Sequence, residues 1–184
     1  MLMPREEALK LVKEHLPNKN LRKHVYAVEA VMRTLARKFS EDEETWGLAG
    51  LLHDLDYEDT KDTPDQHTFL TRDLLEKHDG INEEIIHAIQ AHADFVERKS
   101  LMDKAIYCTD PTTGFLVACA LMHPSKQLSA IDIEFIKRRF KEKRFAAGAN
   151  RDQMAACSEI GLELDDFLMI SRDAMVEISK ELGL

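Results

Sequence analysis

Apolar residues recur every three or four positions along most of this chain, and that spacing predicts helices. In residues 20–39, for example, Val25, Val28, Leu35 and Phe39 fall on one face of a helix. No stretch of useful length alternates apolar and polar residues, as a half-buried strand does. An Asn-Gly or Asp-Gly turn between two alternating runs, the short signal of a hairpin, is also missing. The sequence therefore predicts an all-α fold.

Capping residues mark where the helices begin and end. Predicted N-caps are Ser40, Thr63, Asn82, Ser100, Asn150 and Asp165, while Gly80 and Gly161 are placed where helices should end. The expected helices are 5–15, 20–39, 41–54, 64–78, 83–92, 100–122, 131–146, 151–160 and 165–182. No linker rich in Ser, Gly or Pro divides them. We therefore expect one compact domain of stacked helices over residues 1–184.

Composition narrows the classes of partner. The chain has 34 acidic and 25 basic residues and a net charge of −9, which argues against a nucleic-acid polymer bound through bulk positive charge. No run approaches the roughly 18 apolar residues that span a bilayer, so no membrane partner is expected. The three cysteines, Cys108, Cys119 and Cys157, form no Cys-x-x-Cys pair. That pattern is typical of a reducing compartment, and we expect a cytoplasmic protein. The oligomeric state stays open.

Histidines and aspartates in apolar surroundings are the candidates for chemistry. His53-Asp54 follows the apolar run 48–52, and Asp110 lies within the apolar segment 105–118. Burying either polar group without a partner is costly, and a metal ion bound by both an imidazole and a carboxylate removes that cost. The alternative for any single position is an ordinary hydrogen-bonded core histidine or an Asp–Arg pair. Three more histidines near helix ends or on a long helix add to the set: His24, His67 and His92.

The order His24, His53-Asp54, Asp110 resembles the signature of the HD-domain superfamily of metal-dependent hydrolases. The flanking segments 21–30 and 46–54 resemble that family as well, and 145–152 is similar to a C-terminal extension of one bacterial and archaeal branch. The resemblance covers roughly residues 5–160, and we expect residues 125–184 to form a helical C-terminal extension. A second pair, His78-Asp79, lies in a polar context and is set aside.

Carried over to this sequence, the resemblance implies a metal centre. His24, His53, Asp54 and Asp110 would hold one ion; His67 and His92 would complete a second site, with Asp54 bridging. The ligand types suit one or two divalent ions of Mn, Fe, Co, Ni or Zn. Asp56 and Tyr57 are candidates to orient ligands, or to cap their helix. Lys126 and Arg144 are candidates for a substrate phosphate, or ordinary surface cations. Pro111 predicts a kink or a helix start beside Asp110.

The function implied is hydrolysis of a phosphate ester, in a nucleotide or another small phosphorylated metabolite, by metal-activated water with Asp54 and His53 in catalytic roles. Two alternatives remain open. The same six ligands occur in di-iron oxygenases related to myo-inositol oxygenase, and a non-catalytic sensor could bind a metal or a nucleotide. The marker motifs of alarmone hydrolases and cyclic-dinucleotide phosphodiesterases are missing from the sequence, so neither substrate class is supported.

Overall fold

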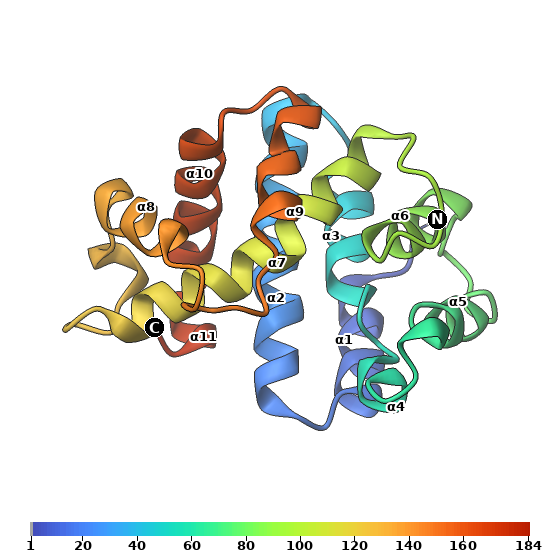
Figure 1. The fold of residues 1–184 in the computed structure, drawn as a ribbon. Helices are drawn as coiled ribbons and strands as arrows, with labels where there is room; N and C mark the ends of the chain where they lie inside the picture. Colours follow the sequence, from blue (N-terminus) through green and yellow to red (C-terminus); the bar gives the residue numbers. More distant parts are fainter. Residues whose placement is uncertain (1) are drawn as a thin grey trace.

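The computed structural model describes residues 2–184, and within that range it contains helices and turns but no strand (Figure 1). The all-α prediction is confirmed. The longer helices are α1 (Arg5–His15), α2 (Lys19–Phe39), α3 (Glu43–Leu52), α6 (Glu83–His92), α7 (Leu101–Met122), α8 (Ile133–Lys141) and α10 (Leu164–Glu177). The shorter elements are α4 (Tyr57–Thr60), α5 (Phe69–Leu75), α9 (Arg151–Ala155), α11 (Ser179–Leu182) and the 3₁₀ turns η1 (Pro64–Gln66), η2 (Leu128–Ala130) and η3 (Ala156–Ile160).

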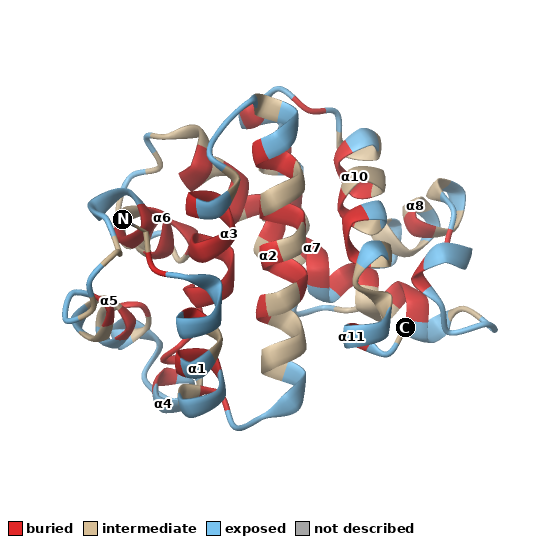
Figure 2. Ribbon diagram, turned by 180° about the vertical axis from the view of Figure 1, so that it is seen from behind, coloured by how far each residue is buried: buried red, intermediate tan, exposed pale blue. Residues whose placement is uncertain are grey.

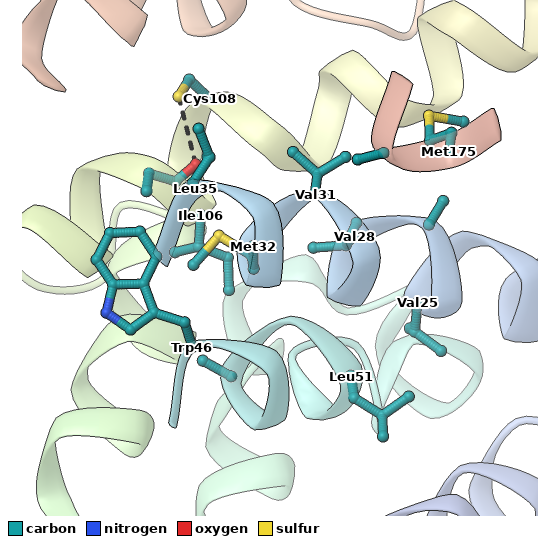
Figure 3. Close-up of a cluster of buried hydrophobic side chains, with 14 of the residues drawn as sticks. Val25, Val28, Val31, Met32, Leu35, Trp46, Leu51, Ile106, Cys108 and Met175 are labelled. Atoms are coloured by element: carbon teal, nitrogen blue, oxygen red, sulfur yellow. Dashed lines mark hydrogen bonds between the residues drawn. The ribbon is translucent and has the colours of Figure 1, made fainter. Parts of the chain in front are cut away.

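Three helices make the centre of the core. α2 packs against α3 on one side and α7 on another, and the buried parts of all three face one another in the middle of the molecule (Figure 2). Every residue from Thr45 to Leu52 in α3 is buried. Figure 3 shows α2 side chains Val28, Val31 and Met32 among those of the neighbouring helices. This burial is the main driving force of folding, since apolar area leaves water along most of each helix.

The approach of α2 to α3 depends on a glycine. A Cβ atom on Gly50 would lie 3.0 Å from both the Cα and the backbone N of Glu29. Backbone cannot move aside as a flexible side chain can, so any larger residue pushes the two helices apart. The close contact fixes the end of α3, and with it His53 and Asp54, relative to His24 on α2.

The central helix α7 contains both a proline and a metal-ligand candidate. The helix runs continuously through Pro111, so the predicted helix start at that residue is wrong. Proline leaves the carbonyl four residues earlier, that of Tyr107, without its helical donor. The side chain of Gln153 supplies one at 2.9 Å. A contact between distant parts of the chain thus compensates for the proline.

By length and composition α7 is also the one helix in residues 2–184 that could cross a membrane. Its most apolar window is 56% buried inside the fold, where it contacts α2, α6 and α10. The core helix of a globular domain meets the same criterion, so the finding is weak evidence of a membrane span.

Some predicted helix ends were wrong for local reasons. Ser40 has a left-handed backbone (φ 59°) and ends α2, and it is Asp42 that caps α3 by accepting from the Thr45 N–H at 2.7 Å. Thr63 precedes only the turn η1, because Thr68 (φ 70°) interrupts the helix and α5 begins at Phe69. Asp165 is not an N-cap: it lies inside α10 and pairs with Lys137 at 2.7 Å. Asn82, Ser100 and Asn150 are N-caps as predicted.

The C-terminal helices lie against the central pair. α10 packs on α2 and α7, while α9 and η3 pack on α7 (Figure 1). Residues 125–184 are therefore in contact with the helices that carry His24 and Asp110.

Replacing Gly50 tests the close helix contact. Gly50→Ala should lower the free energy of unfolding by about 1–3 kcal/mol, because the new methyl group meets backbone. Gly114→Ala is the matched control. Its Cβ would meet nothing within 4 Å, and alanine favours helix by about 1 kcal/mol, so stability should hold or rise. Urea unfolding of both variants measures the difference, and equal stability of the two would contradict the argument.

Candidate metal centre

Six side chains predicted as metal ligands come together at one place. They are His24 from α2, His53 and Asp54 directly after α3, His67 after η1, His92 at the end of α6, and Asp110 in the middle of α7. These residues span 87 positions of sequence, from 24 to 110. Only the packing of α2, α3, α6 and α7 brings them together.

The carboxylate of Asp54 lies between two sets of histidines. Its Oδ2 atom is 3.6 Å from Nε2 of His24 and 3.5 Å from Nε2 of His53. Its Oδ1 atom is 3.3 Å from Nε2 of His67 and 3.6 Å from Nε2 of His92. Asp110 belongs to the first set, with Oδ1 3.0 Å from His24 and 3.7 Å from His53. One oxygen of Asp54 therefore faces each set.

Hydrogen bonds on the far side of the rings decide which nitrogen faces the carboxylates. Nδ1 of His53 is 2.8 Å from the Gly50 carbonyl, and Nδ1 of His92 contacts the Ile89 carbonyl. A carbonyl oxygen only accepts, so Nδ1 carries the hydrogen in both rings. In a neutral imidazole, Nε2 then carries no hydrogen, and its lone pair points at Asp54.

The other two histidines are held in the same way. Nδ1 of His67 is 2.8 Å from Oδ1 of Asp56, an acceptor. Nδ1 of His24 is 3.2 Å from the Thr113 hydroxyl, which already donates to the backbone carbonyl of Asp110 at 3.0 Å. The hydroxyl must therefore accept from His24. All four rings present Nε2 to the carboxylates, as histidine ligands fixed by outer hydrogen bonds do.

The surroundings of Nε2 of His53 show most clearly whether these residues fit a metal ion. The atom is fully buried and has no hydrogen-bond partner, since both nearby carboxylate oxygens are too distant. A buried lone pair beside two anionic oxygens is unfavourable unless a cation sits among them. Imidazole nitrogen and carboxylate oxygen are the donors that Mn, Fe, Co, Ni and Zn accept. The residues present therefore fit a divalent metal.

In the absence of a metal, the opposite charges of the cluster show in the pKa values of Asp54, Asp110 and His67. Burial raises the pKa of Asp54, but the surrounding histidines outweigh it and hold that pKa well below its usual range. Burial likewise raises the pKa of Asp110, and His24 and His53 reverse the effect. Burial lowers the pKa of His67, yet hydrogen bonds to Asp54 and Asp56 raise it to about 10. A metal bound at His67 would displace that proton.

Asp56 and Tyr57 lie next to the cluster. Asp56 is buried; one carboxylate oxygen contacts His67, and the other accepts from the Thr71 N–H at 3.0 Å. It thereby ties the ring of His67 to the start of α5. Tyr57 is 42% exposed, and its ring meets that of His67 edge-on at 6.1 Å between centroids. Their predicted role in orienting ligands stays a prediction.

A cavity of about 490 Å³ opens onto the cluster, a size typical of small-molecule sites. It exposes His24, Asp54, His67, His92 and Asp110 to a ligand, whereas His53 lies behind them. Several lining residues were missed by the sequence analysis: Leu21, Pro111, Gly114, Ala146, Gly148, Ala149 and Gln153. None of them has a side chain that commonly binds a metal, so the sequence offered no reason to place them at the site. The last four come from the C-terminal region.

Arg151 shapes this wall of the cavity. Its guanidinium donates to the backbone carbonyls of Phe140, Phe145, Ala146 and Ala149, at 3.2, 2.6, 3.2 and 2.7 Å. The predicted helix 131–146 ends at Lys141: Glu142 is extended, the following residues form turns, and Ala146 has a left-handed backbone (φ 44°). The guanidinium also lies 4.4 Å from the ring centre of buried Phe115 on α7. Arg151 thus fastens the cavity wall to the core.

Other predicted residues lie away from the cluster. Lys126 and Arg144 are exposed, and neither lines the cavity. Their assignment to a substrate phosphate stays a prediction without a contact in its favour. His78 and Asp79 lie in the loop after α5, with Asp79 exposed. His87 is half-exposed and pairs with Asp103 at 3.1 Å, apart from the cluster.

Removing Asp54 should abolish metal binding. Asp54→Ala deletes the one carboxylate that faces both histidine sets, so metal per chain should fall to background in elemental analysis. Asp79→Ala, in the second His-Asp pair, is the matched control and should keep the full metal content. A fully metallated Asp54→Ala protein would show that the ligand set is wrong.

The number of ions can be read from His67. His67→Ala removes a ligand from one side of Asp54 only, so metal content should fall from two ions per chain to one. His123→Ala should leave the content at two. If His67→Ala has no effect on stoichiometry, the centre holds a single ion on the side of His24 and His53.

Comparison with known proteins agrees with the site. The HD-domain family matches residues 21–143. Three similar proteins are ribonuclease Y of Oleidesulfovibrio alaskensis (27% identity over 170 residues, 90% of this chain and 32% of that protein), of Desulfotalea psychrophila (26% over 168 residues, 89% and 32%) and of Nitratidesulfovibrio vulgaris (25% over 170 residues, 90% and 32%). The chain spans about a third of the length of these relatives. No solved structure matches it.

HD domains bind divalent metals, and their substrates are small molecules or nucleic acids. The matched residues carry the six side chains of the cluster. Because the match covers more than half of the sequence, the chain belongs to the HD-domain family, a superfamily of metal-dependent phosphohydrolases.

Proposed function

We propose that this chain hydrolyses a phosphate ester in a small phosphorylated compound, with two divalent transition-metal ions. The observation that carries the proposal is the position of Asp54, which presents one carboxylate oxygen to His24 and His53 and the other to His67 and His92. A single ion needs only one of these sets. A bridging carboxylate is typical of sites that hold a pair of ions.

The residues then have separate tasks. The metal ions supply a lowered pKa for bound water and positive charge for phosphoryl oxygens. Asp54 and Asp110 fix their positions, and His53 is held behind them by the Gly50 carbonyl. Imidazoles bind metals in their neutral form, and Asp54, Asp56 and Asp110 carry at most three negative charges, so two divalent ions would leave the cluster with an excess of positive charge. An anionic substrate is favoured in such a site.

The cavity favours a small substrate over a polymer. Its volume of about 490 Å³ is that of a small-ligand site. The chain as a whole is acidic, with a net charge of −9. The second candidate is RNA, because the similar proteins named above are ribonucleases. Those proteins are about three times as long, so their activity comes to this chain only as an alternative.

A substrate panel tests the proposal. Protein loaded in turn with Mn, Co, Ni, Zn or Fe should release phosphate from a small phosphomonoester or phosphodiester, and a chelator should abolish that activity until metal is restored. Asp54→Ala is the inactive control. Cleavage of single-stranded RNA with no activity on small esters would favour the second candidate. Two bound iron ions with substrate-dependent oxygen uptake would contradict hydrolysis and support an oxygenase.

A further inference from the structure

A second cavity begins at the metal centre. Its volume is about 420 Å³, and it shares two lining residues, His24 and Gly114, with the cavity described above. We call it the α7 groove, because its floor follows that helix. The two cavities lie end to end along one line of α7, since Asp110, Gly114, Val117 and Leu121 succeed one another at steps of four, three and four residues.

The groove becomes apolar away from the metal ligands. Beyond Gly114 its walls are Ala27, Val117, Leu121, Leu182 and Leu184. Leu121 is 52% exposed, and a large apolar side chain left open in a groove that joins the metal cavity is available to a ligand. Two backbone N–H groups, those of Gly183 and Leu184, bond to the Ser179 carbonyl and hold this wall in place.

Four polar side chains line the groove, and two of them, His24 and Thr113, lie at its metal end. His24 and Thr113 are bonded to each other. Asn20 and Lys23 come from the N-terminal part of α2, and the ammonium group of Lys23 lies on the C-terminal wall, 3.2 Å from where a Cβ on Gly183 would be. No acidic side chain lines the groove. A ligand with its anionic head at the metal end would lay an apolar body against Ala27, Val117, Leu121 and Leu182.

A glycine leaves the junction open. A Cβ on Gly114 would meet nothing within 4 Å, so the helix face between the two cavities carries no side chain. A ligand can therefore extend from Asp110 past Gly114 and reach Val117 and Leu121 without a side chain blocking the junction.

We propose that the substrate is a phosphate ester whose alcohol part carries an extended apolar group, and that this group lies along the α7 groove. The inference rests on the proposed function, because it places the phosphate at the metal centre. It adds the class of alcohol, which the metal ligands alone leave open.

Binding of alkylphosphonates tests the inference without turnover, because their C–P bond is not a hydrolysable ester. Calorimetry of metal-loaded protein should give octylphosphonate an affinity at least tenfold above that of methylphosphonate. Each buried methylene is worth about fourfold. Leu121→Asp should reduce this gain to less than threefold. Met122→Asp is the matched control: it is the next residue, 56% exposed and outside the groove, and it should keep the gain.

The outcomes separate the two proposals. Equal affinity for the two phosphonates would contradict the proposed binding of an apolar group in the α7 groove, but it would still agree with a phosphate site at the metal centre. If the octyl group still raised the affinity at least tenfold in both Leu121→Asp and Met122→Asp, the groove proposal would also be contradicted, because the alkyl chain would then lie elsewhere. If neither phosphonate binds the metal-loaded protein, the phosphate site fails and the groove proposal fails with it. Unfolding midpoints of both variants should match that of the parent protein, since both side chains are exposed.

Discussion

The buried carboxylate of Asp54 and that of Asp110, surrounded by inward-facing imidazole nitrogens, set the main constraint on this molecule. Nδ1 of each histidine in the cluster is committed to an oxygen atom, so each Nε2 points inward at Asp54 or Asp110. In a buried site this arrangement is stable only with cations, either protons or metal ions. The ligand geometry, the raised pKa of His67 and the lowered pKa of Asp54 all follow from it.

The fold supplies rigid supports for these side chains. α3 is buried along nearly its whole length and meets the backbone of α2 at Gly50, so its end cannot shift without moving the core. α7 brings Asp110 from a different part of the chain. Ligands held on packed helices keep their positions when a substrate binds, which is what a preformed metal centre needs.

The C-terminal region decides the surroundings of the centre. Arg151 holds the turns that wall the cavity, Gln153 bonds to the carbonyl freed by Pro111, and Leu182 and Leu184 line the α7 groove. None of these residues is a metal ligand. They shape the cavities around the centre, whereas all six candidate ligands lie at or before position 110.

The sequence by itself determined most of the helices and picked out the six histidine and aspartate side chains that the fold brings together, because 3.6-residue periodicity and histidine-aspartate pairs in apolar runs are local properties. It also separated His53-Asp54 from His78-Asp79 by the apolar residues that precede the first pair. It misplaced the cap at Ser40, because Asp42 offers an equivalent cap two residues later. It also misplaced the helix starts at Thr63 and Asp165, because the backbone begins α5 and α10 after residues whose side chains make no cap hydrogen bond. Only the tertiary structure showed three further features. These are the position of Asp54 between two sets of histidines, the hydrogen bonds of Arg151 to the cavity wall, and the groove along α7. Each of them joins residues far apart in the chain, through packing that no local sequence pattern encodes.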